Sequence, residues 1–156
     1  MLLAIIQVSA VILIEYKQHR KNVTLVSTLK QDVQSSKTIV IYFSRSGNTE
    51  VMAYTIAEVK RGKLINLVAD DYIIGFRGWI NAMIDARKTT AVIKPQEVDL
   101  TEYDTVYIGA PIWLYSPAPP VFEFVSKNDL TGKKVILFNS MNSNSSKSIL
   151  INLKTW

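Results

Sequence analysis

The chain has 156 residues, of which 48% are hydrophobic and 20% are charged, and its net charge at pH 7 is +5. This composition is typical of a globular chain with a core of its own, and it excludes a disordered protein. The absence of cysteine excludes a disulfide framework, thiolate zinc sites and thiol catalysis. The sequence has no Lys/Arg-rich stripe with interleaved aromatic residues, so we expect no nucleic-acid binding.

An apolar stretch opens the chain. Residues 1–14 are almost wholly apolar, and the basic segment 17–21 follows them. A bilayer needs about 20 apolar residues, but Tyr16 and a snorkelling Lys17 would extend the span by a turn. Because the basic residues follow the apolar run, a cleaved secretory signal is disfavoured and the rest of the chain should stay in the cytoplasm. We therefore predict a membrane-anchoring helix over residues 1–21, with the domain on the cytoplasmic side; the alternative is a buried helix of a cytoplasmic chain.

Residues 22–36 are polar and rich in Ser and Gln toward their end, which is typical of a linker, and the domain proper should span residues 37–156. Apolar runs of strand length alternate along this domain with stretches of helical spacing. The alternation predicts an α/β fold, with a parallel sheet wrapped by helices on both faces. The expected strands are 38–43, 63–68, 105–109 and 134–139, and the expected helices are 49–60, 78–88, 119–125 and one that begins near Ser146.

A hydroxyl-rich turn, Ser44-Arg45-Ser46-Gly47-Asn48-Thr49, joins the first strand of the domain to its first helix. The unpaired amides of a first helical turn, and the positive end of the helix dipole, favour an anion at this place. Ser44, Ser46 and Thr49 add hydroxyl donors, and Gly47 lets the backbone bend or approach a ligand closely. Because the turn lacks the lysine of a Gly-x-x-x-x-Gly-Lys-Ser/Thr loop, it suits a terminal phosphomonoester better than a triphosphate. The alternative is an ordinary capped helix start.

Two further loops follow strands and should meet the first loop at the same rim of the sheet, where open α/β sheets bind ligands. Loop 109–120 carries Trp113 and Tyr115 on a backbone stiffened by four prolines, and loop 139–146 offers amides and hydroxyls. A phosphate site, aromatic rings and polar backbone on one rim suit a planar heteroaromatic phosphate ester. Core packing is the alternative role for the two aromatic residues.

Taken together, these motifs resemble those of the flavodoxins. The turn 44–49, the segment Gly109-Ala110-Pro111-Ile112-Trp113 and the segment Leu130-Thr131-Gly132-Lys133-Lys134-Val135 are similar to the branch with a Gly-x-Pro-Ile-Trp loop, over about residues 37–147. The resemblance implies a flavodoxin-like, doubly wound parallel sheet of strand order 2-1-3-4, with the fifth strand apparently missing. It also implies FMN as the cofactor. The implied cofactor-binding residues are Ser44, Arg45, Ser46, Gly47, Asn48 and Thr49 around the phosphate, Pro111, Ile112, Trp113, Leu114 and Tyr115 beside the isoalloxazine, and Ser140, Met141, Asn142, Ser143 and Asn144 on its other side.

Two features depart from the family pattern. The third loop has Met141, Asn142, Ser143 and Asn144 where this branch usually has glycines. A missing fifth strand would leave the apolar strand 134–139 as an exposed edge, which natural chains avoid. We therefore expect that the sequence is a fragment of a longer domain, or that another element covers this edge.

The sequence shows no nucleophile–base pair, metal-ligand set or general base, so we expect no catalytic or metal-binding residues, and any reaction would be the chemistry of the cofactor. The adjacent carboxylates Asp70 and Asp71 are expected in a solvated turn, and Phe76 and Trp79 in packing. We thus expect an FMN-binding redox protein, either an electron carrier or a small reductase, that works with a redox partner protein or with a nicotinamide or small-molecule acceptor. The alternative is a flavodoxin-like binding or scaffold module that has lost flavin.

Overall fold

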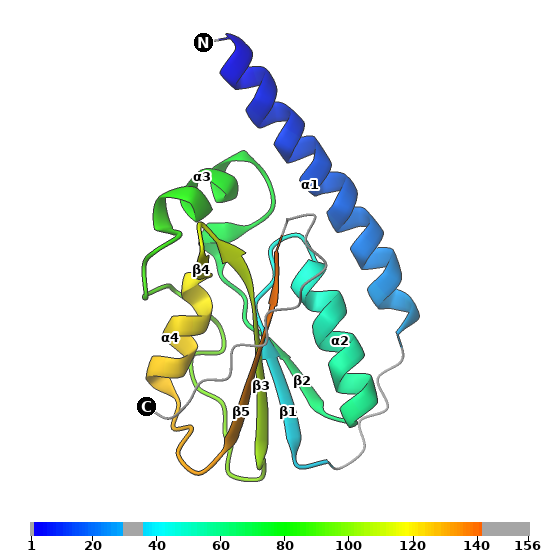
Figure 1. The fold of residues 1–156 in the computed structure, drawn as a ribbon, viewed down its shortest axis with the longest axis vertical. Helices are drawn as coiled ribbons and strands as arrows, with labels where there is room; N and C mark the ends of the chain where they lie inside the picture. The colour runs from blue at the N-terminus through cyan, green and yellow to red at the C-terminus, as the bar shows by residue number, and fades with distance from the viewer. Residues whose placement is uncertain (1, 30–35, 142–156) are drawn as a thin grey trace.

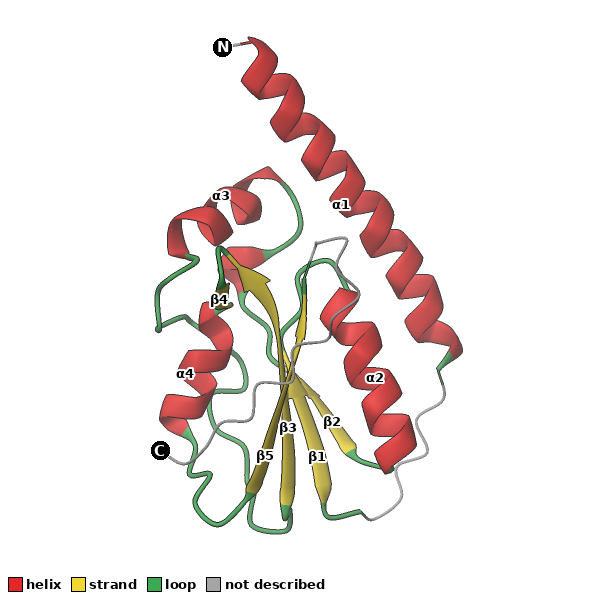
Figure 2. Cartoon of the chain, in the orientation of Figure 1, coloured by secondary structure: helices red, strands yellow, loops and turns green. Residues whose placement is uncertain are grey.

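The computed structural model describes residues 2–29 and 36–141 (Figure 1). Helices and strands alternate along the domain, and the longer helices lie on both sides of one sheet (Figure 2). The helix predicted near Ser146 lies outside the described residues. The helices are α1 (Leu2–Thr28), α2 (Asn48–Lys60), α3 (Phe76–Asp85) and α4 (Pro119–Lys127), with a 3-10 turn η1 (Asp70–Tyr72), and the strands are β1 (Thr38–Tyr42), β2 (Lys63–Asn66), β3 (Thr105–Trp113), β4 (Ser116–Pro117) and β5 (Lys134–Ser140).

The four long strands form a parallel sheet in the order β2-β1-β3-β5. Ile39 of β1 lies opposite Lys63 on one side and Val106 on the other, and Thr105 of β3 lies opposite Lys134 of β5. Counted among the long strands, this is the order 2-1-3-4, so the predicted doubly wound α/β fold is confirmed. Among the described residues β5 is an edge strand of the sheet.

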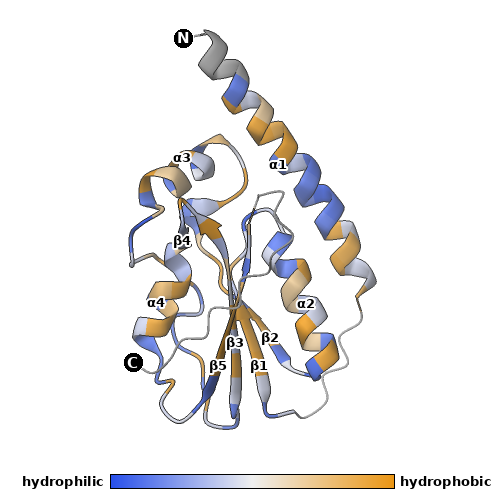
Figure 3. Cartoon of the chain, viewed as in Figure 1, coloured by the Kyte–Doolittle hydropathy of each residue, from blue (hydrophilic) through white to orange (hydrophobic). Residues whose placement is uncertain are grey.

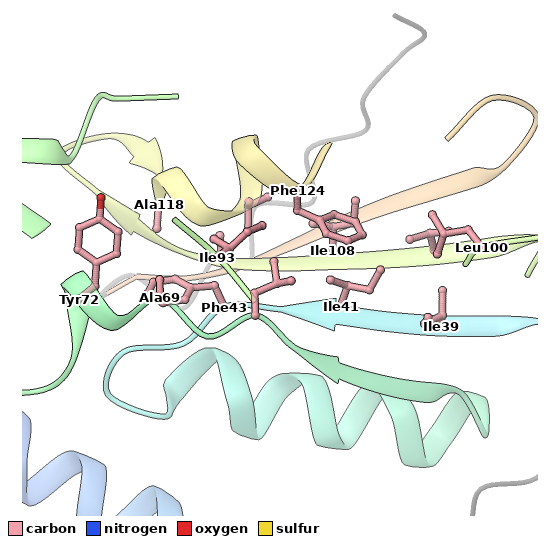
Figure 4. Close-up of a cluster of buried hydrophobic side chains, with 14 of the residues drawn as sticks. Ile39, Ile41, Phe43, Ala69, Tyr72, Ile93, Leu100, Ile108, Ala118 and Phe124 are labelled. Atoms are coloured by element: carbon pink, nitrogen blue, oxygen red, sulfur yellow. The ribbon is translucent and has the colours of Figure 1, made fainter. Parts of the chain in front are cut away.

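Alternate residues of β1 enter two different cores, as the period of two along a strand requires. Ile39 and Ile41 face the larger core, which α4 closes with the fully buried Phe124 (Figure 4). Val40 and Tyr42 face a smaller core under α2, together with Phe138 of β5. Both faces of the central strand are therefore buried, which explains why its sequence is a continuous apolar run.

Gly109 sits where β3 passes beneath a ring from the neighbouring strand. A Cβ atom at this position would lie 2.2 Å from Cζ of Phe138. The glycine is therefore required for the close approach of the Phe138 ring to the sheet, just before the loop that follows β3.

Strand β3 continues four residues beyond its predicted end at Gly109, because Ile112 and Trp113 pair with the short antiparallel strand β4. Leu114 and Tyr115 form the two-residue turn between them, and both have a positive φ, 44° and 68° respectively. The first part of the predicted loop 109–120 is thus a strand and a tight hairpin. The hairpin projects the side chain of Tyr115, which is 93% exposed, away from the domain.

The N-terminal helix differs most from the prediction. Helix α1 continues to Thr28, so residues 22–28, predicted as part of a linker, are helical; they contain no Gly or Pro to end the helix. None of the described helices combines the length and the apolarity needed to cross a membrane. The predicted membrane anchor is therefore not supported. In α1 hydrophilic residues, among them Glu15, Lys17 and Arg20, lie between two hydrophobic stretches (Figure 3).

Candidate functional site

A cavity of about 590 Å³ lies at the carboxyl ends of β1, β3 and β5. The loops that follow these three strands line it, and α1 and α3 supply the remaining walls. The volume lies within the range of small-molecule sites, and the position is the one at which open α/β sheets bind ligands. The lining residues are Val11, Ile14, Glu15, Gln18, Arg45, Ser46, Asn48, Trp79, Ala82, Met83, Pro111, Ile112, Trp113, Leu114, Ser140 and Met141.

The first loop, residues 44–49, turns sharply into α2. Gly47 is the residue before the helix and has a φ of 89°, a conformation that glycine adopts without strain. Its amide is hydrogen-bonded to Oγ of Ser44 at 3.1 Å. Because glycine has no side chain to cap the helix, the first amides of α2 are left for another acceptor. Ser46 and Asn48 of this loop line the cavity.

The guanidinium of Arg45 is buried between α1 and the start of α3. Its side chain is 4% exposed and forms an ion pair with Glu15, and Nη2 donates to the carbonyl of Gly75 at 2.9 Å. Nε of Arg45 is buried without a hydrogen-bond partner among the described residues, and so is Oε2 of Glu15. Burial lowers the pKa of Arg45 to about 10, so the group remains a cation at neutral pH.

The second loop brings an indole ring to the cavity. Trp113 is half-buried, and its ring lies edge-on to the rings of Phe43 at 5.7 Å and Tyr72 at 5.1 Å between centroids. Trp113 therefore packs against core residues and also forms part of the cavity wall. The hydroxyl of Tyr72 donates to Oδ2 of Asp85 at 3.1 Å, and burial with this bond raises the pKa of Tyr72.

The third loop is tied to the first. The hydroxyls of Ser140 and Thr49 lie 2.7 Å apart, and Thr49 is fully buried. Ser140 and Met141 line the cavity beside this link. The predicted convergence of the first and third loops on one rim is thus seen at the atomic level.

The structure brings nine of the predicted site residues together around the cavity: Arg45, Ser46, Asn48, Pro111, Ile112, Trp113, Leu114, Ser140 and Met141. Four others do not line it: Ser44 and Gly47 are hydrogen-bonded to each other within the first loop, Thr49 is hydrogen-bonded to Ser140, and Tyr115 is exposed to solvent. Asn142, Ser143 and Asn144 lie outside the described residues.

Two walls of the cavity were not predicted. Trp79, Ala82 and Met83 of α3 line it, although Trp79 was expected only in packing. No loop motif in the sequence marks α3 as a wall.

The adjacent carboxylates Asp70 and Asp71 lie in η1 and do not line the cavity. Asp70 is exposed, and its Oδ2 lies 3.7 Å from Nζ of Lys94.

The other wall is α1, which docks on the first loop through a polar stripe. Nδ2 of Asn22 donates to the carbonyl of Ser46 at 2.9 Å and to Oδ1 of Asn48 at 2.8 Å, and Oδ1 of Asn22 accepts from Gln18 at 3.0 Å. Asn22 is 4% exposed, and its Cβ would lie 2.7 Å from a Cβ added to Gly47. The spacing of Glu15, Gln18 and Asn22, which places them on one helical face, was the signal in the sequence.

Comparisons with known proteins agree with this architecture. A protein from Bacteroides uniformis ATCC 8492, identified provisionally as a flavoprotein, is 28% identical and has a TM-score of 0.61, over 72% of this chain and 76% of that one. A second such protein, from Bacteroides eggerthii DSM 20697, is 25% identical with a TM-score of 0.60, over 70% and 74% of the two chains. A flavoprotein from Lactobacillus acidophilus NCFM, solved in complex with FMN, shares the fold at 24% identity and a TM-score of 0.57, over 70% and 78%.

No curated protein sequence is significantly similar to this chain. The family model described as flavodoxin matches residues 37–156, which include β1 and every element after it in the chain. The sheet order and the three loops around the cavity are in keeping with that match. The chain therefore belongs to the flavodoxin family.

Proposed function

We propose that this chain binds FMN without a covalent link and serves as a redox protein. The observation that carries the proposal is the cavity at the carboxyl ends of β1, β3 and β5, which joins a polar turn at a helix start to an indole-lined wall. Its volume suits a ligand of this class. When bound, FMN supplies one- and two-electron redox chemistry; the protein contributes binding, orientation and electrostatics.

The first loop would hold the phosphate. The first amides of α2 lack a side-chain cap at Gly47, and they lie at the positive end of the helix dipole. Ser46 adds a hydroxyl at the cavity surface, and Asn48 adds an amide. Hydrogen bonds to a charged group contribute about 1.5–3 kcal/mol each, so a few of them give tight binding.

The second and third loops would hold the ring system. Pro111, Ile112 and Leu114 offer an apolar surface, and the edge contacts of Trp113 with Phe43 and Tyr72 fix the indole in place. Ser140 of the neighbouring strand β5, which lies opposite Pro111 in the register of the sheet, and Met141 after it also line the cavity. A planar ring between these loops would be shielded from water over much of its surface.

Two roles are compatible with this site: an electron carrier for a partner protein, and a small reductase that takes hydride from a nicotinamide. Two large hydrophobic side chains of the hairpin, Leu114 at the cavity wall and Tyr115 next to it in the chain, are exposed. They favour contact with another protein surface, so we place the carrier first. Oxidation of a nicotinamide cofactor by the FMN-loaded protein at a substantial rate would reverse this order.

Flavin binding is tested by titrating the full chain with FMN and following flavin fluorescence. We expect saturable quenching at one FMN per chain, and we expect Ser46→Ala to weaken binding about tenfold, as the loss of one charge-assisted hydrogen bond predicts. Ser126→Ala is the matched control, because this hydroxyl on α4 is exposed and donates to the carbonyl of Glu123 within its own helix. A chain that folds but leaves flavin fluorescence unchanged would refute the proposal and favour the alternative, a binding or scaffold module without flavin.

A further inference from the structure

Helix α1 lies outside the segment that matches the flavodoxin model, yet it supplies part of the cavity wall. Val11, Ile14, Glu15 and Gln18 are lining residues. The family domain alone therefore does not account for the composition of this site.

The contribution of α1 includes a charge. Among the described residues that line the cavity, Glu15 is the one carboxylate and Arg45 the one Lys or Arg. They are paired with each other, with side chains 19% and 4% exposed respectively. The pair leaves this end of the cavity without net charge, although the sequence places an arginine in the anion-binding turn.

A phosphomonoester carries about −1.5 to −2 charges at pH 7, so it interacts with each member of the pair with opposite sign. Nε of Arg45 and Oε2 of Glu15 are both buried and have no hydrogen-bond partner among the described residues, so a phosphate in the cavity would interact with the two charges through space, attractively with the guanidinium and repulsively with the carboxylate. We propose that Glu15 is a specificity-determining residue of the flavin site, which weakens the preference for a phosphorylated flavin by neutralising Arg45. This inference rests on the proposed function, that the cavity holds a flavin.

Contacts that do not involve the charge of Glu15 also hold α1 on the first loop. Asn22, on the same face of α1, makes its two donated bonds to the first loop with neutral groups, and Gln18 supports it. Replacing the carboxylate by the isosteric amide therefore leaves α1 docked. The substitution Glu15→Gln also keeps an acceptor oxygen for Arg45, and it changes the charge of the pair from zero to plus one.

The test compares FMN with riboflavin, which has the same ring system and no phosphate. Dissociation constants of both are measured by fluorescence titration for the full-length wild type, for Glu15→Gln and for the control Glu58→Gln. Glu58 is exposed in the last turn of α2, so its replacement makes the same change in net charge at the end of that helix away from the loop. The ratio of the riboflavin constant to the FMN constant isolates the interaction with the phosphate.

We expect Glu15→Gln to raise this ratio about tenfold, the scale of one charge–charge interaction across part of a protein interior. We expect Glu58→Gln to change it by less than about twofold, because exposed charges at that distance are screened. An unchanged or lowered ratio in Glu15→Gln would overturn the inference while flavin binding itself stands. If folded wild type and variants bind neither flavin, the proposed function fails and the inference fails with it.

The variants Arg45→Gln and Glu15→Gln/Arg45→Gln repeat the comparison without the buried cation, in case Glu15→Gln alone does not fold. The ratio should be lowest in Arg45→Gln, where the carboxylate is unpaired, and should return to about the wild-type value in the neutral double variant. Equal ratios in these two variants would also overturn the inference.

Discussion

The dock between α1 and the first loop makes a prediction that concerns a single amide group. In Asn22→Ala the Cβ beside Gly47 remains, whereas the two donated hydrogen bonds to Ser46 and Asn48 are lost, together with the bond accepted from Gln18 within α1. The two bonds to the loop contribute about 0.5–1.5 kcal/mol net each, so their loss should lower the free energy of unfolding by about 1–3 kcal/mol. The side chain is 4% exposed, so water does not replace these bonds unless α1 moves away.

Urea denaturation followed by circular dichroism measures this loss as a lower midpoint at unchanged slope. Thr24→Ala is the matched control, since Thr24 is exposed on α1 and its hydroxyl donates to the carbonyl of Arg20 within the same helix. If Asn22→Ala and Thr24→Ala unfold at the same urea concentration, α1 is not held on the loop by this amide.

Three further predictions concern stability. Gly109→Ala should lower the free energy of unfolding by about 1–3 kcal/mol, seen as a lower Tm, because the new Cβ would force the Phe138 ring to move; an unchanged Tm would contradict the close contact. Tyr115→Gly should raise the Tm by the equivalent of about 1 kcal/mol, because it relieves a positive φ at a side chain with little contact to lose, and a fall in Tm would show that the Tyr115 side chain packs. Burial beside Glu50 raises the pKa of Tyr42. Above about pH 10 the unfolded chain therefore loses this proton first, and the free energy of unfolding falls by up to about 1.4 kcal/mol per pH unit. Urea midpoints measured at several alkaline pH values should fall less steeply with pH in Tyr42→Phe, and an identical fall in both proteins would count against a raised pKa at Tyr42.

The sheet and its three loops could be predicted because their signals are local. The apolar run of β1 has the length of a buried strand, and the carboxyl ends of parallel strands lie at one edge, so the loops after them had to converge. Ser46, Trp113 and Ser140 can therefore be expected at one edge of the sheet, and the structure has all three around one cavity. The hairpin at Leu114 and Tyr115 was missed because such two-residue turns are usually marked by Asn-Gly or Asp-Gly.

The part of the site formed by α1 could not be predicted in the same way. Glu15, Gln18 and Asn22 share a helical face, but a polar stripe indicates a partner surface only once that surface is known. In the sequence Glu15 and Gln18 follow an apolar run and resemble the flank of a membrane anchor, whereas Asn22 falls at the start of the predicted linker. The role of these residues becomes visible only through tertiary contacts between distant parts of the sequence, such as the pair Glu15 and Arg45, which are 30 residues apart.

The dock of α1 also bears on how this protein should be produced. A recombinant fragment trimmed to the family boundary at Lys37 would lose Glu15 and Asn22, and with them the counterion of a buried guanidinium and the amide that braces the first loop. Affinities measured on such a fragment would describe a site whose charge the natural chain does not have. Material that includes α1 is therefore the proper starting point for any quantitative work on ligand binding.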